Sequence, residues 1–272
     1  MKNPGLPISA PPPQPPQSEN DEIVVRGLHK SFGSNHVLRG LDITIRKGET
    51  FAVIGRSGCG KSVLFKHIMG LMKPDQGEVY VLGQRVDTLR KNDLLKLRDR
   101  IGMVFQLSAL LNSLTVRENV ILGLSERGLM SKKEMDRVAA EKLALVGLDG
   151  AQDLLPEELS GGMKKRVAVA RTLAMSPEII LFDEPTTGLD PLMSDNVDSL
   201  IKDLKAKVRC TNVVVTHDMI SAFRIADRIG MFHEGRIVEV ATPSEFLASK
   251  NPVVQEFIRR TIHWRSEDGH VG

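Results

Sequence analysis

Eight residues, GRSGCGKS at positions 55–62, constrain this chain more than any other stretch. They fit the pattern G-x-x-x-x-G-K-[ST], in which glycines let backbone N–H groups curl around a phosphate group. The apolar run TFAVIG that leads into them predicts a buried strand, and a helix is expected to follow them. A strand, a glycine loop and a helix start in this order predict a phosphate-binding loop in a parallel α/β sheet.

Each residue type in this loop has a part in binding phosphate. Lys61 is predicted to reach the β- and γ-phosphates of a nucleotide, and the hydroxyl of Ser62 to ligate Mg²⁺. We interpret Cys59 as a small residue of the loop rather than a reactive thiol. The alternative is a glycine-rich turn without a ligand. The predicted nucleotide-binding residues here are Gly55, Arg56, Ser57, Gly58, Cys59, Gly60, Lys61 and Ser62.

A second buried strand, within EIILFDE at 178–184, ends in two carboxylates. Ligands of open α/β sheets bind at the carboxyl ends of the strands. Asp183 is therefore predicted to hold Mg²⁺ through water, and Glu184 to activate the water that attacks the γ-phosphate. His217 ends another apolar strand at the same edge, and a γ-phosphate contact is predicted for it. The alternative for the carboxylates is a solvated strand end.

The stretch LSGGM at 159–163 forms another candidate anion site. Ser160 is predicted to cap the helix that follows, and the N–H groups at a helix start attract anions. A chain of this size with two such sites requires an explanation, because the loop at 55–62 already provides one.

The composition, at 41% hydrophobic and 26% charged residues, is that of a globular protein. A net charge of +3 with 4% aromatic residues does not favour a nucleic-acid partner, and two cysteines exclude a disulfide framework. No apolar run reaches about 18 residues, so the chain is expected to be soluble and to meet a membrane only through a partner. The proline-rich residues 1–20 are expected to be a disordered tail, either a tether or a docking peptide.

Strands that alternate with helices are expected along the rest of the chain, which is typical of a parallel α/β sheet. Strands are expected at 22–28, 37–45, 101–106 and 211–218, with a hairpin around Glu234 and Gly235. Helices are expected at 64–72, 92–100 behind an Asn92 cap, 131–146 behind a Ser131–Glu134 capping box, 160–175, 190–207, and from Thr242 and Asn251. The apolar stripe of the last helix packs either on its own domain or on a neighbouring subunit.

Six features occur in one order along the chain: the loop at 55–62, Gln106 after IGMVF, LSGGM at 159–163, ILFDE at 180–184, GLD at 188–190, and His217. Together they resemble the nucleotide-binding subunit of an ABC transporter over about residues 22–247. The resemblance implies an α/β P-loop NTPase (RecA-like) core with an inserted helical subdomain and an antiparallel β element. It places the ATPase domain at 21–247, with a helical insertion at about 107–175, between the tail 1–20 and a C-terminal helical tail at 248–272.

The resemblance also implies a role for individual residues in ATP hydrolysis. Phe32 matches the aromatic residue that stacks on adenine, where many family members have tyrosine. Gln106 matches the glutamine that touches Mg²⁺ and links the site to a transmembrane partner. Glu184 matches the catalytic base, with Lys61 and His217, the switch histidine, beside it in the catalytic set.

A head-to-tail homodimer is implied by the remaining matches. Ser160, Gly161 and Gly162 match the signature that binds the γ-phosphate of the ATP held by the other subunit, and Asp190 matches the acid that acts across the dimer. Two ATP molecules would then each lie between the loop at 55–62 of one chain and the helix start at 160 of the other, which gives both anion sites a purpose.

A narrower resemblance points to the MlaF-type ATPases of Mla/Mce phospholipid transport systems. It rests on Met163, where many members have glutamine, on QLSALLNSLTVRENV and on NPVVQEFI. The expected partner is an MlaE-like integral membrane permease, and the expected location is the cytoplasmic face of the bacterial inner membrane. The alternatives are an ABC ATPase subunit for another substrate, a soluble ABC-type ATPase that acts on ribosomes or DNA, and a nucleotide-binding switch without catalysis.

Overall fold

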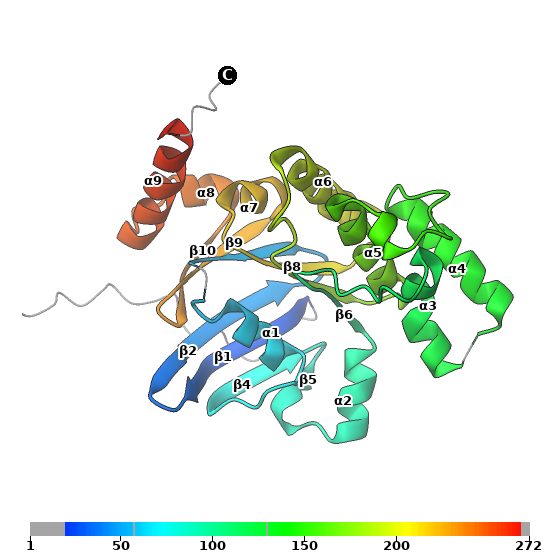
Figure 1. Ribbon diagram of the computed structural model, residues 1–272. Coiled ribbons are helices and arrows are strands. Elements are labelled where there is room, and N and C mark those ends of the chain that lie inside the picture. Colours follow the sequence, from blue (N-terminus) through cyan, green and yellow to red (C-terminus); the bar gives the residue numbers. More distant parts are fainter. Residues whose placement is uncertain (1–19, 57, 129, 268–272) are drawn as a thin grey trace, which may run out of the picture. The chain divides into compact units, whose positions relative to one another are not determined.

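The computed structural model describes residues 20–56, 58–128 and 130–267, with side chains up to Arg260. The predicted tail, up to residue 19, and Ser57 of the glycine loop lie outside the described residues. The chain divides into two compact units. One takes residues 1–47, 51–89 and 226–272, and the other takes residues 48–50 and 90–225. Figure 1 colours the elements of both units by sequence.

An antiparallel sheet with the strand order β2-β1-β4-β5 dominates the first unit. Its long strands β1 (Asp21–Phe32) and β2 (Asn35–Arg46) agree with the prediction. The strands β4 (Gln76–Val81) and β5 (Gln84–Arg85) were not predicted. The signal for β4 is short, because only Val79 and Val81 alternate into the core.

A second set of strands in the first unit carries the glycine loop. Strand β3 (Thr50–Ile54) pairs in parallel with β9 (Arg228–His233), and β9 forms the predicted hairpin with β10 (Arg236–Ala241). Every residue of β3 is buried, as expected for a parallel strand covered on both faces. The glycine loop leaves the end of β3.

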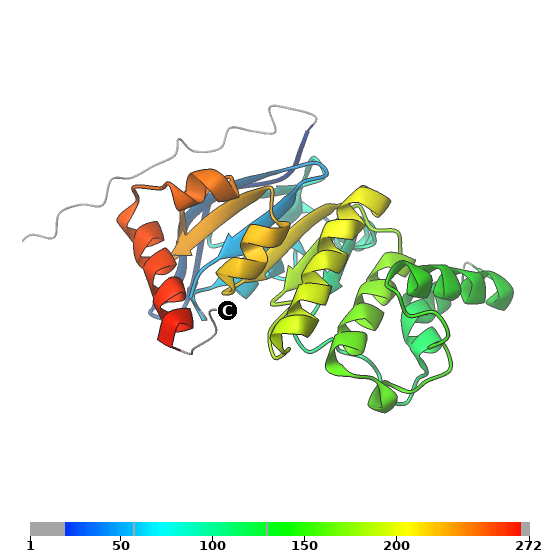
Figure 2. The ribbon, with the colours of Figure 1, turned by 90° about the horizontal axis from the view of Figure 1, so that it is seen from above.

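The described part of this unit also contains the helices α1 (Lys61–Ile68), α8 (Pro243–Leu247) and α9 (Pro252–Glu267) and the 3₁₀ turn Val86–Thr88. The prediction that the first helix reaches Met72 is wrong. Gly70 turns into the left-handed region at φ 62°, and its N–H donates to the carbonyl of His67, which ends the helix. Figure 2 shows α9 beside α8, which it contacts.

Three parallel strands form the centre of the second unit, in the order β8-β7-β6. They are β6 (Ile101–Val104), β7 (Ile179–Asp183) and β8 (Thr211–Thr216), and their register aligns Met103 with Leu181 and Leu181 with Val213. All six residues of β8 are buried. Near-continuous apolar sequence therefore predicted that these strands exist, but β6 ends at Val104 and β8 at Thr216, each two residues before its predicted end.

Helices surround these strands and supply most of the core of the second unit. The helices α3, α4 and α5 lie side by side in Figures 1 and 2 and contact one another. Buried side chains of α5, among them Val167, Val169 and Leu173, pack in this core. The helices are α2 (Lys91–Arg98), α3 (Val116–Arg127), α4 (Lys132–Leu145), α5 (Gly161–Ala174), α6 (Pro191–Val208) and α7 (Met219–Ile225), with a 3₁₀ turn at Pro156–Glu158.

In this unit, each predicted N-cap residue except one stands immediately before its helix. Ser131 with Glu134, Ser160 and Asp190 cap α4, α5 and α6 as predicted. The predicted Asn92 cap is wrong, because α2 begins at Lys91 and Asn92 lies inside its first turn. Among the described residues, no helix has the length and apolar character needed to cross a membrane.

Candidate phosphate-binding and catalytic site

The glycine loop between β3 and α1 passes very close to neighbouring segments of the chain. Gly60 has φ 114°, and a Cβ there would lie 2.6 Å from the Cγ1 of Val37. A Cβ at Gly55 would lie 2.6 Å from the carbonyl oxygen of Phe232. Both distances are far below van der Waals contact, so the glycines of the motif are required for the loop to pass here.

Lys61 is held inside the loop. Its side chain is 5% exposed, and its Nζ donates to the carbonyl oxygens of Gly55 at 2.8 Å and Arg56 at 3.0 Å. The first turn of α1 holds no acidic residue that would offset the positive end of the helix. Ser62, which follows Lys61 in this turn, is exposed. The ammonium and the positive end of the helix therefore lie together beside the glycine loop, an arrangement that favours an anionic ligand.

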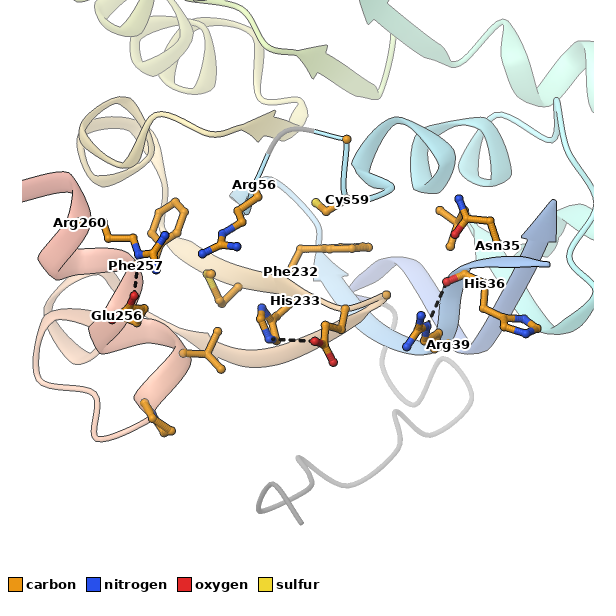
Figure 3. Close-up of a pocket in the computed structure, with 17 residues that line it drawn as sticks. Asn35, His36, Arg39, Arg56, Cys59, Phe232, His233, Glu256, Phe257 and Arg260 are labelled. Carbon is orange, nitrogen blue, oxygen red and sulfur yellow. Dashed lines mark hydrogen bonds and ion pairs between the residues drawn. The ribbon is translucent and has the colours of Figure 1, made fainter. Parts of the chain in front are cut away.

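A pocket of about 650 Å³ lies beside the loop within the first unit (Figure 3). Arg56 and Cys59 of the loop project into it, Phe232 lies across it, and Glu256 of α9 closes one side.

Phe32, the predicted adenine-stacking residue, lies at the end of β1 with 47% of its surface exposed. The Nζ of Lys30 lies over its ring, 5.9 Å from the centre.

Glu184 of the second unit lies just past the end of β7 in a left-handed backbone conformation, with φ 49°. Its N–H donates to the carbonyl of Val215 at 2.8 Å. The strand ends at Asp183, so Glu184 belongs to the turn that follows and not to the strand itself. Such a conformation costs about 1–2 kcal/mol for a residue other than glycine, so the surrounding contacts must hold it.

The carboxylate of Glu184 and the ring of His217 contact each other just past the ends of β7 and β8, the edge of the sheet at which the sequence places both residues. The Oε2 of Glu184 lies 2.8 Å from the Nδ1 of His217 and also accepts from the N–H of His217 at 3.3 Å. The hydroxyl of Thr187 donates to the same oxygen at 3.2 Å. The Glu184 side chain is 12% exposed, whereas that of His217 is 49% exposed. Thr187 was not predicted.

Two basic side chains of α5 hold the segment around Gln106, and neither was predicted. Buried Lys165 donates to the carbonyl of Gln106, and Arg171 donates to the carbonyls of Ser108 at 2.7 Å and Ala109 at 2.6 Å. Burial lowers the pKa of Lys165, while Asp183 and Glu184 act in the opposite direction. These contacts fix the backbone that carries the exposed side chain of Gln106.

The starts of α5 and α6 adjoin each other. The Oγ of Ser160 accepts from the N–H of Met163 at 3.2 Å, and a carboxylate oxygen of Asp190 accepts from the N–H of Met193 at 2.9 Å. A Cβ on Gly162 would lie 2.8 Å from the sulfur of Met193, so this glycine lets the two helix starts approach. The first turn of α5 carries no acidic residue, which leaves its positive end available to an anion.

The predicted Mg²⁺ ligands are chemically suited to that ion. Ser62 offers a hydroxyl, Gln106 an amide oxygen and Asp183 a carboxylate. Mg²⁺ prefers oxygen donors and takes few from the protein, with phosphate oxygens and water completing its octahedron. When bound, it would neutralise charge on the β- and γ-phosphates.

The family model described as "ABC transporter" matches residues 38–187. Among curated relatives, the chain is 44% identical to "Protein TRIGALACTOSYLDIACYLGLYCEROL 3, chloroplastic" of Arabidopsis thaliana, over 88% of this chain and 74% of that protein. It is 42% identical to the methionine import ATP-binding protein MetN of Mesorhizobium japonicum, over 82% of this chain and 61% of that protein.

Solved structures of similar chains share the fold. The dimeric ATP-binding cassette MJ0796, bound to ADP and Pi, superposes with a TM-score of 0.73 at 35% identity, over 81% of this chain and 98% of that one. CbiO1 of Clostridium perfringens, part of the complex CbiONQ, gives a TM-score of 0.80 at 29% identity, over 91% of this chain and 99% of that one.

Proposed function

The chain belongs to the ABC transporter family and has the fold of its ATPase domain, and on this premise we propose that it energises phospholipid transport at the bacterial inner membrane. ATP hydrolysis is the activity of this family's cassettes. The observation that carries the ATPase assignment is the glycine loop, with Lys61 buried at its mouth and a helix start behind it.

The loop at 55–62 is assigned to the β- and γ-phosphates of ATP. Its N–H groups surround the phosphates, and Lys61 exchanges its two carbonyl partners for phosphate oxygens. Phe32 stacks on adenine through its exposed ring. Ser62, Gln106 and Asp183 are assigned to Mg²⁺.

Glu184 is assigned as the base that orients and deprotonates the attacking water. A nearby His217 serves as the partner that contacts the γ-phosphate, and the 2.8 Å contact between the two side chains supports a shared task. Both side chains are held from the backbone side, Glu184 by its left-handed turn and His217 by its N–H bond to Glu184. A fixed base needs little reorganisation when the reaction occurs.

The signature at Ser160, Gly161 and Gly162, with Asp190 beside it, is assigned to the ATP of a second copy of the chain. The helix start offers N–H groups and a positive end without a competing acid. Two copies related by a two-fold axis would each complete the other's site. Loss of the γ-phosphate on hydrolysis would then loosen the dimer, and a permease would use that motion.

Phospholipid is the proposed cargo, with an MlaE-like permease as partner and the cytoplasmic face of the inner membrane as location. Met163, the segment after Gln106 and the start of α9 support it, as does the glycerolipid in the name of the Arabidopsis relative. The similarity to MetN supports a second candidate, a subunit for another substrate such as methionine.

ATP binding is tested with Lys61→Ala in a fluorescent-nucleotide titration. The variant should lose ATP binding, and Lys66→Ala, which removes an exposed ammonium from the same helix, should bind as the unmodified protein does. Equal affinity in the Lys61 variant would refute the phosphate assignment.

The cargo is tested by purifying tagged protein from membranes in mild detergent. An MlaE-like permease and co-purifying phospholipid are expected. A methionine permease, or a sugar permease, recovered in its place would refute the lipid assignment and leave the ATPase assignment intact.

A further inference from the structure

A cluster of polar side chains, buried at its centre, joins α6 to α7 in the second unit. At its centre is Asp198 of α6, which is 2% exposed. The hydroxyl of Ser221, also buried on α7, donates to one carboxylate oxygen of Asp198. The guanidinium of Arg224 lies 3.6 Å from the other oxygen and bonds to the more exposed Asp195. Both oxygens of one buried carboxylate thus face a single short helix.

The same cluster continues to the start of α7. A carboxylate oxygen of Asp218 accepts from the N–H groups of Ile220 at 2.8 Å and Ser221 at 3.2 Å, and its own N–H donates to the hydroxyl of Thr216 at 2.9 Å. Ser221 therefore belongs both to the first turn of α7 and to the cluster on α6. The residue before Asp218 is His217, which meets Glu184.

The other end of this connection is the start of α6. Asp190 caps that helix, and Asp198 lies further along it. A continuous run of helix and hydrogen bonds therefore leads from Asp190 through Asp198 and Ser221 to His217. Both ends belong to the site proposed above, and every residue between them lies in the second unit.

A carboxylate in this position is costly, which argues that it does more than fill space. Burial raises the pKa of Asp198 to about 6, with further contributions from Asp218 and Asp195, against the hydrogen bond from Ser221 and the charge of Arg224. An apolar side chain of similar size packs in such places at lower cost, whereas an acid with two fixed partners specifies one arrangement of the helices.

We propose that Asp198 is a positioning residue that locks α7 to α6 and thereby fixes His217 relative to Asp190. This inference rests on the ATPase roles proposed for those two residues. His217 is assigned to the γ-phosphate and Asp190 to the contact across the dimer, so their misplacement lowers the rate of hydrolysis more than the affinity for ATP, which the loop at 55–62 provides.

The test uses Asp198→Asn in the full chain, with Asp203→Asn as the control, because Asp203 is an exposed acid of the same helix paired with Lys207. Hydrogen exchange without nucleotide should rise at residues 217–221 and 190–194 in the Asp198 variant, and stay unchanged in the control. The kcat should fall at least about fivefold with KM for ATP within about twofold.

The pH dependence of kcat distinguishes a positioning role of the ionised carboxylate from a role in packing alone. The ratio of the kcat values of unmodified protein and Asp198→Asn should approach one as the pH falls below about 6, because the unmodified carboxyl then becomes neutral too. Unchanged exchange at both helix starts, or exchange raised evenly over the whole second unit, would overturn the proposal.

Should the Asn variant fail to fold, Ser221→Ala removes one bond only and should give the same pattern of exchange at smaller amplitude. Lack of ATP hydrolysis by the unmodified protein would count against the proposed function. The hydrogen-exchange pattern would still show whether Asp198 holds α7 against α6.

Discussion

The Nδ1 of His217 lies 2.8 Å from the Oε2 of Glu184, and the backbone N–H of His217 donates to that same oxygen. A carboxylate oxygen accepts hydrogen bonds, so the Nδ1 of His217 is the donor in this contact. The two bonds to one oxygen hold the orientation of the half-exposed ring. A change at either residue is expected to disturb the other.

Glu184→Gln should bind ATP but lose turnover by at least about 10²-fold, because the amide keeps the shape of the side chain and cannot take a proton. With hydrolysis blocked, ATP should hold the variant as a dimer, measured by size-exclusion chromatography with light scattering. Glu141→Gln, at an exposed position on α4, should behave as the unmodified protein. Normal turnover in the Glu184 variant would show that another group is the base.

Ser160→Ala and Ser131→Ala separate capping from catalysis. Each removes a hydroxyl that accepts from an N–H in the first turn of its helix, so each should lower the free energy of unfolding by about 1 kcal/mol in urea titrations. Only Ser160→Ala should also reduce ATPase activity, since Ser131 lies outside the proposed site. An equal loss of activity in both variants would mean that stability alone explains it.

Gly60→Ala and Gly83→Ala compare two glycines with positive φ, 114° and 75°. A Cβ at Gly83 meets nothing within 4 Å, so its cost is backbone strain of about 1–2 kcal/mol. A Cβ at Gly60 also overlaps Val37, which should add about 1–3 kcal/mol and abolish nucleotide binding. Calorimetric unfolding and a nucleotide titration measure both effects, and ATP binding by Gly60→Ala would contradict the packing argument.

The pH dependence of stability should report Asp198. Its pKa is about 6 in the folded protein and about 3.9 in an unfolded chain, so the folded state holds a proton that the unfolded state has lost between these values. The free energy of unfolding therefore falls as pH rises through this window, by about 3 kcal/mol for this group. Asp198→Asn should lack that contribution, so its stability relative to the unmodified protein should rise from pH 4 to pH 7 in urea titrations. A constant difference would mean that the carboxyl is not perturbed.

Much of the site could be predicted because its parts are written in local patterns. The loop at 55–62 follows one buried strand, and Glu184 and His217 each follow a buried strand of their own. Ser160 and Asp190 are typical N-cap residues and mark the starts of two helices. Parallel strands then bring distant segments to one edge of a sheet, so that Glu184 and His217 meet without any sequence signal between them.

The remainder depends on contacts that join distant residues through side chains. Lys165 donates to the carbonyl of Gln106 and Arg171 to that of Ser108, and no pattern in LSGGMKKRVAVAR marks which lysine will be buried. The left-handed turn at Glu184 is likewise a result of its packing, because the residue type gives no preference for it. Asn92 shows the opposite failure, where a good capping residue lies inside a helix that began one position earlier.

The two carbonyl partners of Lys61 give the loop a stand-in for the nucleotide. The triphosphate binding proposed above would therefore replace existing hydrogen bonds of the Lys61 ammonium with bonds to phosphate oxygens. The net gain at this amine is then the difference between phosphate and carbonyl acceptors, which is smaller than the full strength of either bond.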